Sequence, residues 1–332
     1  MTKSICLLLL MAACFGADAQ DAKRLHEIGK NYLVDGDYAN AESMLYSAYT
    51  ADTNDISIIK DLTLCYFFEK DYARGIALMT PLIDRQQADD QCFQILGSLY
   101  RTQNNYASSM AIYTAAIKKY PDNGAFYNEI GELMQLNNDP QCIAFWERGI
   151  EKDPPYPSNY FNACKFYHAS GDKIWAALYG EIYVNIDPLN ARTVEIKDIL
   201  LEDYTYMLTA LVNEGMPKEK NKFAQKVFTT FNRQADVVKM GISTATLTML
   251  RTRFILDWYQ DKTDRFPCAL FEYHQQLLRL GLFDAYNQWL FGSAENLSGF
   301  QFWTQLHNLE YGSFVKYQRS NVFSVPKGQY YH

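Results

Sequence analysis

The clearest alternation of apolar and polar positions lies in residues 90–123. The first half of this stretch carries one apolar stripe at helical spacing, formed by Phe93, Leu96 and Tyr100. The second half carries another, formed by Tyr113, Ala116 and Ile117. Asn104-Asn105 separates the two halves and is typical of a turn. The pattern therefore predicts two short helices joined by a tight turn.

Small residues indicate how these two helices pack. Gly97 on the first helix and Ser109 on the second leave room for a close approach where they meet. Pro121 ends the second helix and begins the connection to the next unit. A helix pair of this length cannot bury both stripes alone, so we expect it to stack on similar neighbours.

The spacing of these residues resembles one unit of the tetratricopeptide repeat (TPR) family, a 34-residue helix–turn–helix. The match runs from Asp90 to Pro121 and departs only at Ser109, where the family usually has alanine. Four further stretches follow the same spacing, so that five units are predicted at residues 22–55, 56–89, 90–123, 124–156 and 157–190. The second unit departs at Thr63, where the small residue is lost, and the fourth is one residue short.

Beyond Leu189 the period is lost but helical patterns continue. We expect helices at 193–213, 221–231, 244–259, 267–280 and 296–307, and an irregular tail from Asn321. Residues 283–289 loosely resemble the turn and second helix of a degenerate repeat. The sequence thus predicts an all-α protein: a right-handed α-solenoid of about five TPR units at 22–190, followed by a helical capping extension with degenerate repeats at 191–332.

The first nineteen residues read as a bacterial export signal. Lys3 supplies the positive start, residues 5–15 are apolar, and Ala17-Asp18-Ala19 forms a cleavage site before Gln20. We therefore expect a periplasmic or cell-envelope protein. The residues before Cys14 loosely resemble a lipoprotein signal, so an outer-membrane lipoprotein, or a secreted protein, remains an alternative. Membrane association would require lipidation at Cys14, because no other stretch could span a bilayer.

Composition narrows the classes of partner. The formal net charge of −7 argues against nonspecific nucleic-acid binding. The predicted mature chain has five cysteines and no C-x-x-C pair: Cys65, Cys92, Cys142, Cys164 and Cys268. We expect buried free thiols, with a disulfide such as Cys65–Cys92 left open for an oxidising compartment.

Motifs for catalysis or for a cofactor are not found. The sequence lacks the nucleophile elbow, the phosphate-binding loop, the H-E-x-x-H metal motif and the EF-hand loop. The five histidines are widely separated, and the acidic pairs Asp89-Asp90 and Glu202-Asp203 are interpreted as solvated caps and faces. We therefore predict no enzyme activity, no cofactor and no metal site.

The resemblance implies a binding surface, because the first helices of TPR units line a concave groove that holds a peptide or a partner's helix. Projecting the stripes gives the positions that face this groove. The candidate residues are Lys23, His26, Lys30, Lys60, Phe67, Phe68, Arg101, Phe161, Lys165 and His168. Five of them are Lys or Arg, against a single acidic groove residue, Glu132. This balance predicts an acidic or carboxylate-terminated peptide, with the phenylalanines as apolar anchors.

Two alternatives stay open for these residues. The basic side chains could simply be solvated helix faces. The lysine–asparagine clamp of chaperone-binding TPR proteins is not matched, because Asp61 stands where the clamp needs an asparagine.

The extension is rich in aromatic residues, which would either fill a core or stack on a ligand. They are Phe254, Trp258, Tyr259, Phe271, Tyr273, Tyr286, Trp289, Phe291, Phe300, Phe302, Trp303 and Tyr311. The leading function is a protein-interaction scaffold. The alternatives are a glycan- or nutrient-binding protein that uses these aromatics, and an enzyme with its site in the extension.

Overall fold

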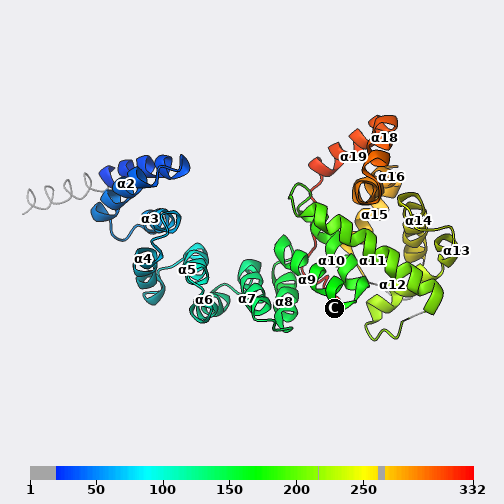
Figure 1. Cartoon of the computed structure of the whole chain (residues 1–332), viewed down its shortest axis with the longest axis horizontal. Helices are drawn as coiled ribbons and strands as arrows, with labels where there is room; N and C mark the ends of the chain where they lie inside the picture. The colour runs from blue at the N-terminus through cyan, green and yellow to red at the C-terminus, as the bar shows by residue number, and fades with distance from the viewer. Residues whose placement is uncertain (1–19, 216, 261–265) are drawn as a thin grey trace, which may run out of the picture. The chain divides into compact units, whose positions relative to one another are not determined.

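The computed structural model describes residues 20–215, 217–260 and 266–332, so the predicted leader lies outside the described residues. The fold is all-helical, with successive helices paired and stacked as in TPR solenoids. It divides into two compact units, which meet in the sequence between Pro121 and Asp122. Unit 1 holds the first three predicted repeats, and unit 2 holds the last two together with the C-terminal helices (Figure 1).

Unit 1 consists of helix pairs. Residues 20–34 are helical, and they are followed by α2 (Tyr38–Ala51), α3 (Ile56–Phe68), α4 (Tyr72–Asp84), α5 (Asp90–Thr102) and α6 (Tyr106–Lys119). The residue before each of these helices from α2 on caps it, because its side-chain oxygen accepts a backbone N–H of the first turn. The capping residues are Asp37, Asp55, Asp71, Asp89 and Asn105.

The turn inside each repeat has the same backbone conformation. Gly36, Lys70 and Asn104 all have positive φ, and they lie 34 residues apart. In unit 2, Asn138 and Gly171 occupy the matching place with φ of 54° and 91°. The left-handed conformation closes the first helix and turns the chain back along it. The repeat is therefore present in the backbone as well as in the apolar pattern.

Close helix approach depends on one glycine in each of three repeats. Gly29 faces Leu45, Gly97 faces Tyr113 and Gly131 faces Trp146. In the third repeat the Ser109 hydroxyl also donates to the Gly97 carbonyl at 2.9 Å, as the small residues predict. The two repeats that lack this glycine compensate on the second helix. Thr63 packs against Gly75, and Cys164 packs against Gly180.

Unit 2 begins with two helix pairs, α7 (Gly124–Leu136) with α8 (Cys142–Lys152) and α9 (Pro157–Ser170) with α10 (Lys173–Ile186). The C-terminal helices follow them. They are α11 (Thr193–Glu214), α12 (Lys222–Asn232), α13 (Ala235–Val238), α14 (Thr244–Gln260), α15 (Ala269–Arg279), α16 (Phe283–Asn287), the π-helix η1 (Gln288–Gly292), α17 (Ser293–Glu295), α18 (Leu297–Leu306) and α19 (Asn308–Ser320). The expected helices are present, but the sequence pattern missed α13, α17, α19 and the π-helix.

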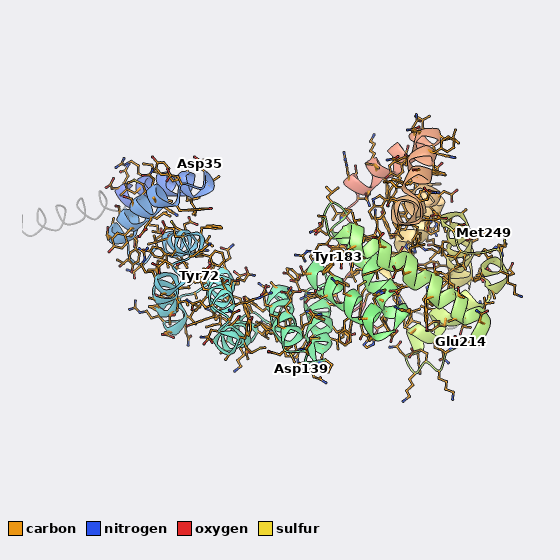
Figure 2. All side chains as sticks on the ribbon, viewed as in Figure 1. Asp35, Tyr72, Asp139, Tyr183, Glu214 and Met249 are labelled. Carbon is orange, nitrogen blue, oxygen red and sulfur yellow. The ribbon has the colours of Figure 1, made fainter. Side chains whose placement is uncertain are left out.

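One hydrophobic core runs through unit 2. It joins Trp146 of α8 and Tyr183 of α10 to Phe254 and Phe291 of the C-terminal helices; Tyr183 is labelled in Figure 2. The repeat pattern stops near residue 190, but the core does not. The tail beyond Asn321 is irregular, as expected, yet Phe323 and Val325 are buried in this same core. The C-terminal helices therefore share their stability with the fourth and fifth repeats.

Among the described residues, the helices are too short or too polar for any of them to cross a membrane.

Candidate partner-binding surface

A cavity of about 560 Å³ lies in unit 1, on the side formed by the first helices of three consecutive repeats. It is lined by Lys23, His26, Glu27, Lys30, Asp55, Ser57, Lys60, Asp61 and Gln91. Four of the residues predicted to face the groove are in this lining, three from the first helix and one from α3. The helical register places them there, because residues three, four and seven apart share one face of a helix.

Lys60 links the second repeat to the third. Its ammonium donates to the Asp89 carboxylate at 2.7 Å and to the Gln91 side-chain oxygen at 2.7 Å. Asp89 also caps α5 by accepting the Cys92 N–H at 3.0 Å. Partial burial raises the pKa of Asp89, but the bonds from Lys60 and Cys92 outweigh it and hold that pKa below its usual value. One carboxylate thus starts a helix and neutralises a lysine.

His26 makes the equivalent link from the first repeat to the second. Its Nε2 lies 2.6 Å from the Asp61 carboxylate, and the imidazole is only 9% exposed. Lys30 lies 3.6 Å from Glu27 on its own helix. Lys23 is exposed and has no ion pair among the described residues. The cavity therefore holds cations and carboxylates in nearly equal number.

The predicted residues of unit 2 are paired in the same way. Lys165 of α9 lies 2.6 Å from Glu195 of α11. His168 lies 2.8 Å from Asp203, which also accepts from Lys173 at 2.9 Å. Asp203 is completely buried, so its interpretation as a solvated acidic face is wrong. Of the five cations predicted for the groove, Lys60 and Lys165 are therefore each paired with an acid one repeat further along the chain.

The predicted apolar anchors differ in exposure. Phe68 is 48% exposed and stacks on Tyr38 with ring centroids 5.2 Å apart. Phe67 is half-buried and meets Phe68 edge to face at 5.8 Å. Both lie in the last turn of α3, on a helix that also lines the cavity. Phe68 is therefore the more exposed of the two rings.

Phe161 is in a different position. It is 8% exposed and belongs to the core of unit 2. The Lys165 ammonium and the Arg192 guanidinium each lie 5.1 Å from its ring centroid and cover it. Arg101 is half-buried in the last turn of α5 and is not in the cavity lining. The structure brings the candidate residues of the first two repeats together and leaves Phe161 enclosed.

The aromatic residues of the extension mostly fill the core. Seven of the twelve are buried: Phe254, Trp258, Phe271, Tyr273, Tyr286, Trp289 and Phe291. They contact one another edge to face or stacked, as between Trp258 and Phe271 at 4.8 Å. These rings cannot serve as an exposed platform for a sugar. Only Phe302 is strongly exposed, at 69%.

A buried polar cluster in unit 2 was not foreseen. Glu181 of α10 accepts from Tyr286 at 2.7 Å and from Tyr204 at 3.0 Å. It pairs with Arg251 and lies 2.8 Å from His274. Burial alone would raise the pKa of Glu181, but Arg251, His274 and Tyr286 hold it at about 2. The side chains of the cluster are buried, and together they join α10, α11, α14, α15 and α16.

No group of three or more His, Cys, Asp or Glu side chains in residues 20–215, 217–260 and 266–332 is arranged to hold a metal ion. The five cysteines of this part of the chain are all free and buried. A disulfide between Cys65 and Cys92 is therefore absent from the structure.

Neither a family model nor a curated protein matches the chain. Among solved structures, it is similar to PilF of Pseudomonas aeruginosa, with 15% identity, a TM-score of 0.48, and coverage of 59% of this chain and 92% of that one. It is also similar to a thermophilic TPR protein of Thermus thermophilus, with 13% identity and a TM-score of 0.43. That similarity covers 54% of this chain and 99% of the other. A third similar structure is YrrB, described as a TPR protein with an unusual peptide-binding site, with 12% identity and a TM-score of 0.40. That similarity covers 56% of this chain and 96% of YrrB.

The sequence reasoning missed the acidic half of the cavity. Glu27, Asp55 and Asp61 line it, and Asp89 neutralises Lys60 from its edge. A signal was present, because each pair joins residues about one repeat apart: His26 with Asp61, and Lys60 with Asp89. A count of charged residues made on one helix at a time does not detect such pairs, because their two members lie in different repeats.

Proposed function

We propose that this chain is an exported, non-catalytic interaction scaffold that binds a segment of a protein partner in the unit 1 cavity. The observation that carries the proposal is the cavity itself. It spans the first helices of three repeats and exposes donors and acceptors from each. A groove of this kind suits an extended segment, because one ligand can contact several repeats at once.

The paired charges change the partner that we propose. Lys23 and Lys30 are exposed, and their neighbours Glu27 and Asp55 are exposed or half-exposed carboxylates. An all-acidic ligand would meet these carboxylates as well as the lysines, so like-charge repulsion would offset much of its attraction. We therefore propose a segment of mixed charge. Its apolar residues would rest on Phe67 and Phe68, beside the charged lining.

The proposed location is the periplasm or another part of the cell envelope, on the basis of the leader at residues 1–19. In that compartment the chain would hold one component of an assembly against another. Unit 2 would serve as a stable body that carries the repeats, since its core joins two of them to the C-terminal helices.

The test is selection from a random peptide library displayed on phage, followed by affinity measurement with synthetic peptides. Two variants remove cavity groups, Lys60→Ala and the pair Phe67→Ala with Phe68→Ala. Lys118→Ala is the matched control, because Lys118 is exposed on α6, a second helix. We expect selected peptides to lose about tenfold or more in affinity for both cavity variants. Equal affinity for all four proteins would contradict the proposal.

A further inference from the structure

The helix α18 has an unusual surface for a water-exposed helix. Its ten residues, Leu297 to Leu306, include no charged side chain and no buried residue. Leu297, Phe302 and Leu306 are 58–69% exposed, and Leu309 at the start of α19 is 85% exposed. We call Phe302, Leu306 and Leu309 the α18–α19 apolar surface, because Leu297 lies nine residues before Leu306 and therefore on the other side of α18. An exposed apolar cluster of this kind is typical of an interaction site.

A neighbouring face of α18 packs against α19 and fixes this surface in place. Phe300 and Trp303 both contact Tyr311, with ring centroids 5.8 Å and 6.5 Å apart. Tyr311 packs in turn on Phe314, which is fully buried in the core of unit 2. Figure 1 shows α18 and α19 at the edge of unit 2, beside α16. The apolar surface is therefore held outward on a packed support.

The charged side chains near the surface are two cations, Lys316 and Arg319, and one carboxylate. Residues 297–320 contain a single carboxylate, Glu310, which lies 3.3 Å from His307. Lys316 and Arg319 are exposed on α19 and have no ion-pair partner in the described part of the chain. Lys316 lies seven residues after Leu309 and so on the same face of the helix. Exposed apolar side chains with cations beside them would complement a surface in which a negatively charged layer covers an apolar layer, as at the surface of an anionic membrane.

We propose that the α18–α19 apolar surface binds the surface of a membrane that contains anionic lipids. Phe302, Leu306 and Leu309 would enter the boundary between headgroups and acyl chains, and Lys316 and Arg319 would contact lipid phosphates. The helices lie on the membrane and do not cross it. This attachment needs no lipid on Cys14, and it is separate from the unit 1 cavity.

A second copy of the chain fits this surface less well. A two-fold dimer through it would bring two copies of the same patch together, so four cations would lie near only two carboxylates. Charge alone is also insufficient for membrane binding, because the whole chain carries −7. Apolar insertion must therefore supply most of the affinity, and salt should weaken the binding only in part.

The experiment is co-sedimentation of the mature chain, from Gln20, with vesicles of phosphatidylcholine containing one quarter phosphatidylglycerol. The wild-type chain should bind, and Phe302→Gln with Leu306→Gln should weaken binding about tenfold or more. Leu189→Gln is the matched control, since Leu189 is 85% exposed in unit 2 but outside the surface. Lys316→Gln with Arg319→Gln should weaken binding to these vesicles by roughly tenfold, and leave binding to pure phosphatidylcholine unchanged.

Folding is checked by thermal unfolding of each variant, and no change is expected, since the replaced side chains are exposed. Wild-type chain that stays in the supernatant would overturn the proposal. So would equal binding of Phe302→Gln with Leu306→Gln and of the wild type. A wild-type dimer in analytical ultracentrifugation that dissociates on these two substitutions would assign the surface to a second copy instead.

Discussion

Gly97 lies directly against the ring of Tyr113, so that a Cβ atom added to the glycine would be 2.3 Å from two of the ring carbons. No real side chain tolerates that distance, and the ring cannot retreat, since Tyr113 is fully buried. The same contact recurs at Gly29 with Leu45 and at Gly131 with Trp146. The glycine therefore sets how closely the two helices of a repeat can pack.

The substitution Gly97→Leu should force α5 and α6 apart and lower the free energy of unfolding of unit 1 by about 1–3 kcal/mol or more. Thermal and chemical unfolding would measure the change. Gly312→Ala is the control, because a Cβ there meets open space on a helix; it should be neutral or slightly stabilising. An unchanged melting temperature for Gly97→Leu would show that the helix register is wrong.

The buried Glu181 makes unit 2 sensitive to acid. Its folded-state pKa is about 2 against an ordinary value of 4.5, so it contributes stability above pH 4.5 that is lost as the pH falls toward 2. The shift corresponds to about 3 kcal/mol. Glu181→Gln should remove this pH dependence and, by leaving Arg251 unpaired, cost about 3–5 kcal/mol near neutral pH.

The measurement is circular dichroism of unfolding between pH 2 and 7, with Glu202→Gln as control, because Glu202 is exposed. The control should follow the wild type. A wild-type acid transition that Glu181→Gln leaves unchanged would contradict the role assigned to this carboxylate.

The five cysteines should be unreactive in the folded protein. All are buried and free, and burial raises the pKa of Cys65 and of Cys92 to about 12, which leaves almost no thiolate at neutral pH. Iodoacetamide should modify them only after denaturation, as read by mass spectrometry, and a reductant should not shift the melting temperature. Rapid labelling of the native protein, or a Cys65–Cys92 bond in material from cells, would contradict this expectation.

Replacing Lys60 should weaken peptide binding more than it lowers the free energy of unfolding. Its partner Asp89 is 42% exposed, so Lys60→Ala should change the free energy of unfolding by less than about 1 kcal/mol. The affinity for a bound peptide should nevertheless fall, since the ligand loses a donor in the cavity. Denaturant unfolding and titration calorimetry on the same protein measure both quantities. A loss of stability equal to the loss in binding free energy would make Lys60 a structural residue only.

Local signals made most of the fold predictable. Capping residues such as Asp55 and Asp89 fix where helices begin, and small residues such as Gly97 fix where they touch. The short π-helix and α19 gave no such signal, because neither begins with a capping side chain. Glu181, Arg251 and His274 likewise lie on three separate helices, and no periodic pattern connects them.

The binding surface was predictable only in part. The helical projection found Lys60 and His26, because it depends on one helix at a time. It could not find Asp89 or Asp61 as their partners, since those contacts depend on how one repeat stacks on the next. Phe161 was assigned to the surface for the same reason, although Tyr183 of α10 and Arg192, the residue before α11, lie against its ring.

The most direct test of the account places a photo-reactive benzoylphenylalanine at Gln91, inside the unit 1 cavity, and irradiates intact cells. The same group at Lys118, exposed on α6, is the control. We predict one dominant partner crosslinked from Gln91, absent from Lys118 and reduced by Lys60→Glu. Crosslinking that is equal at the two positions, or unaffected by Lys60→Glu, would contradict the claim that this cavity binds the partner.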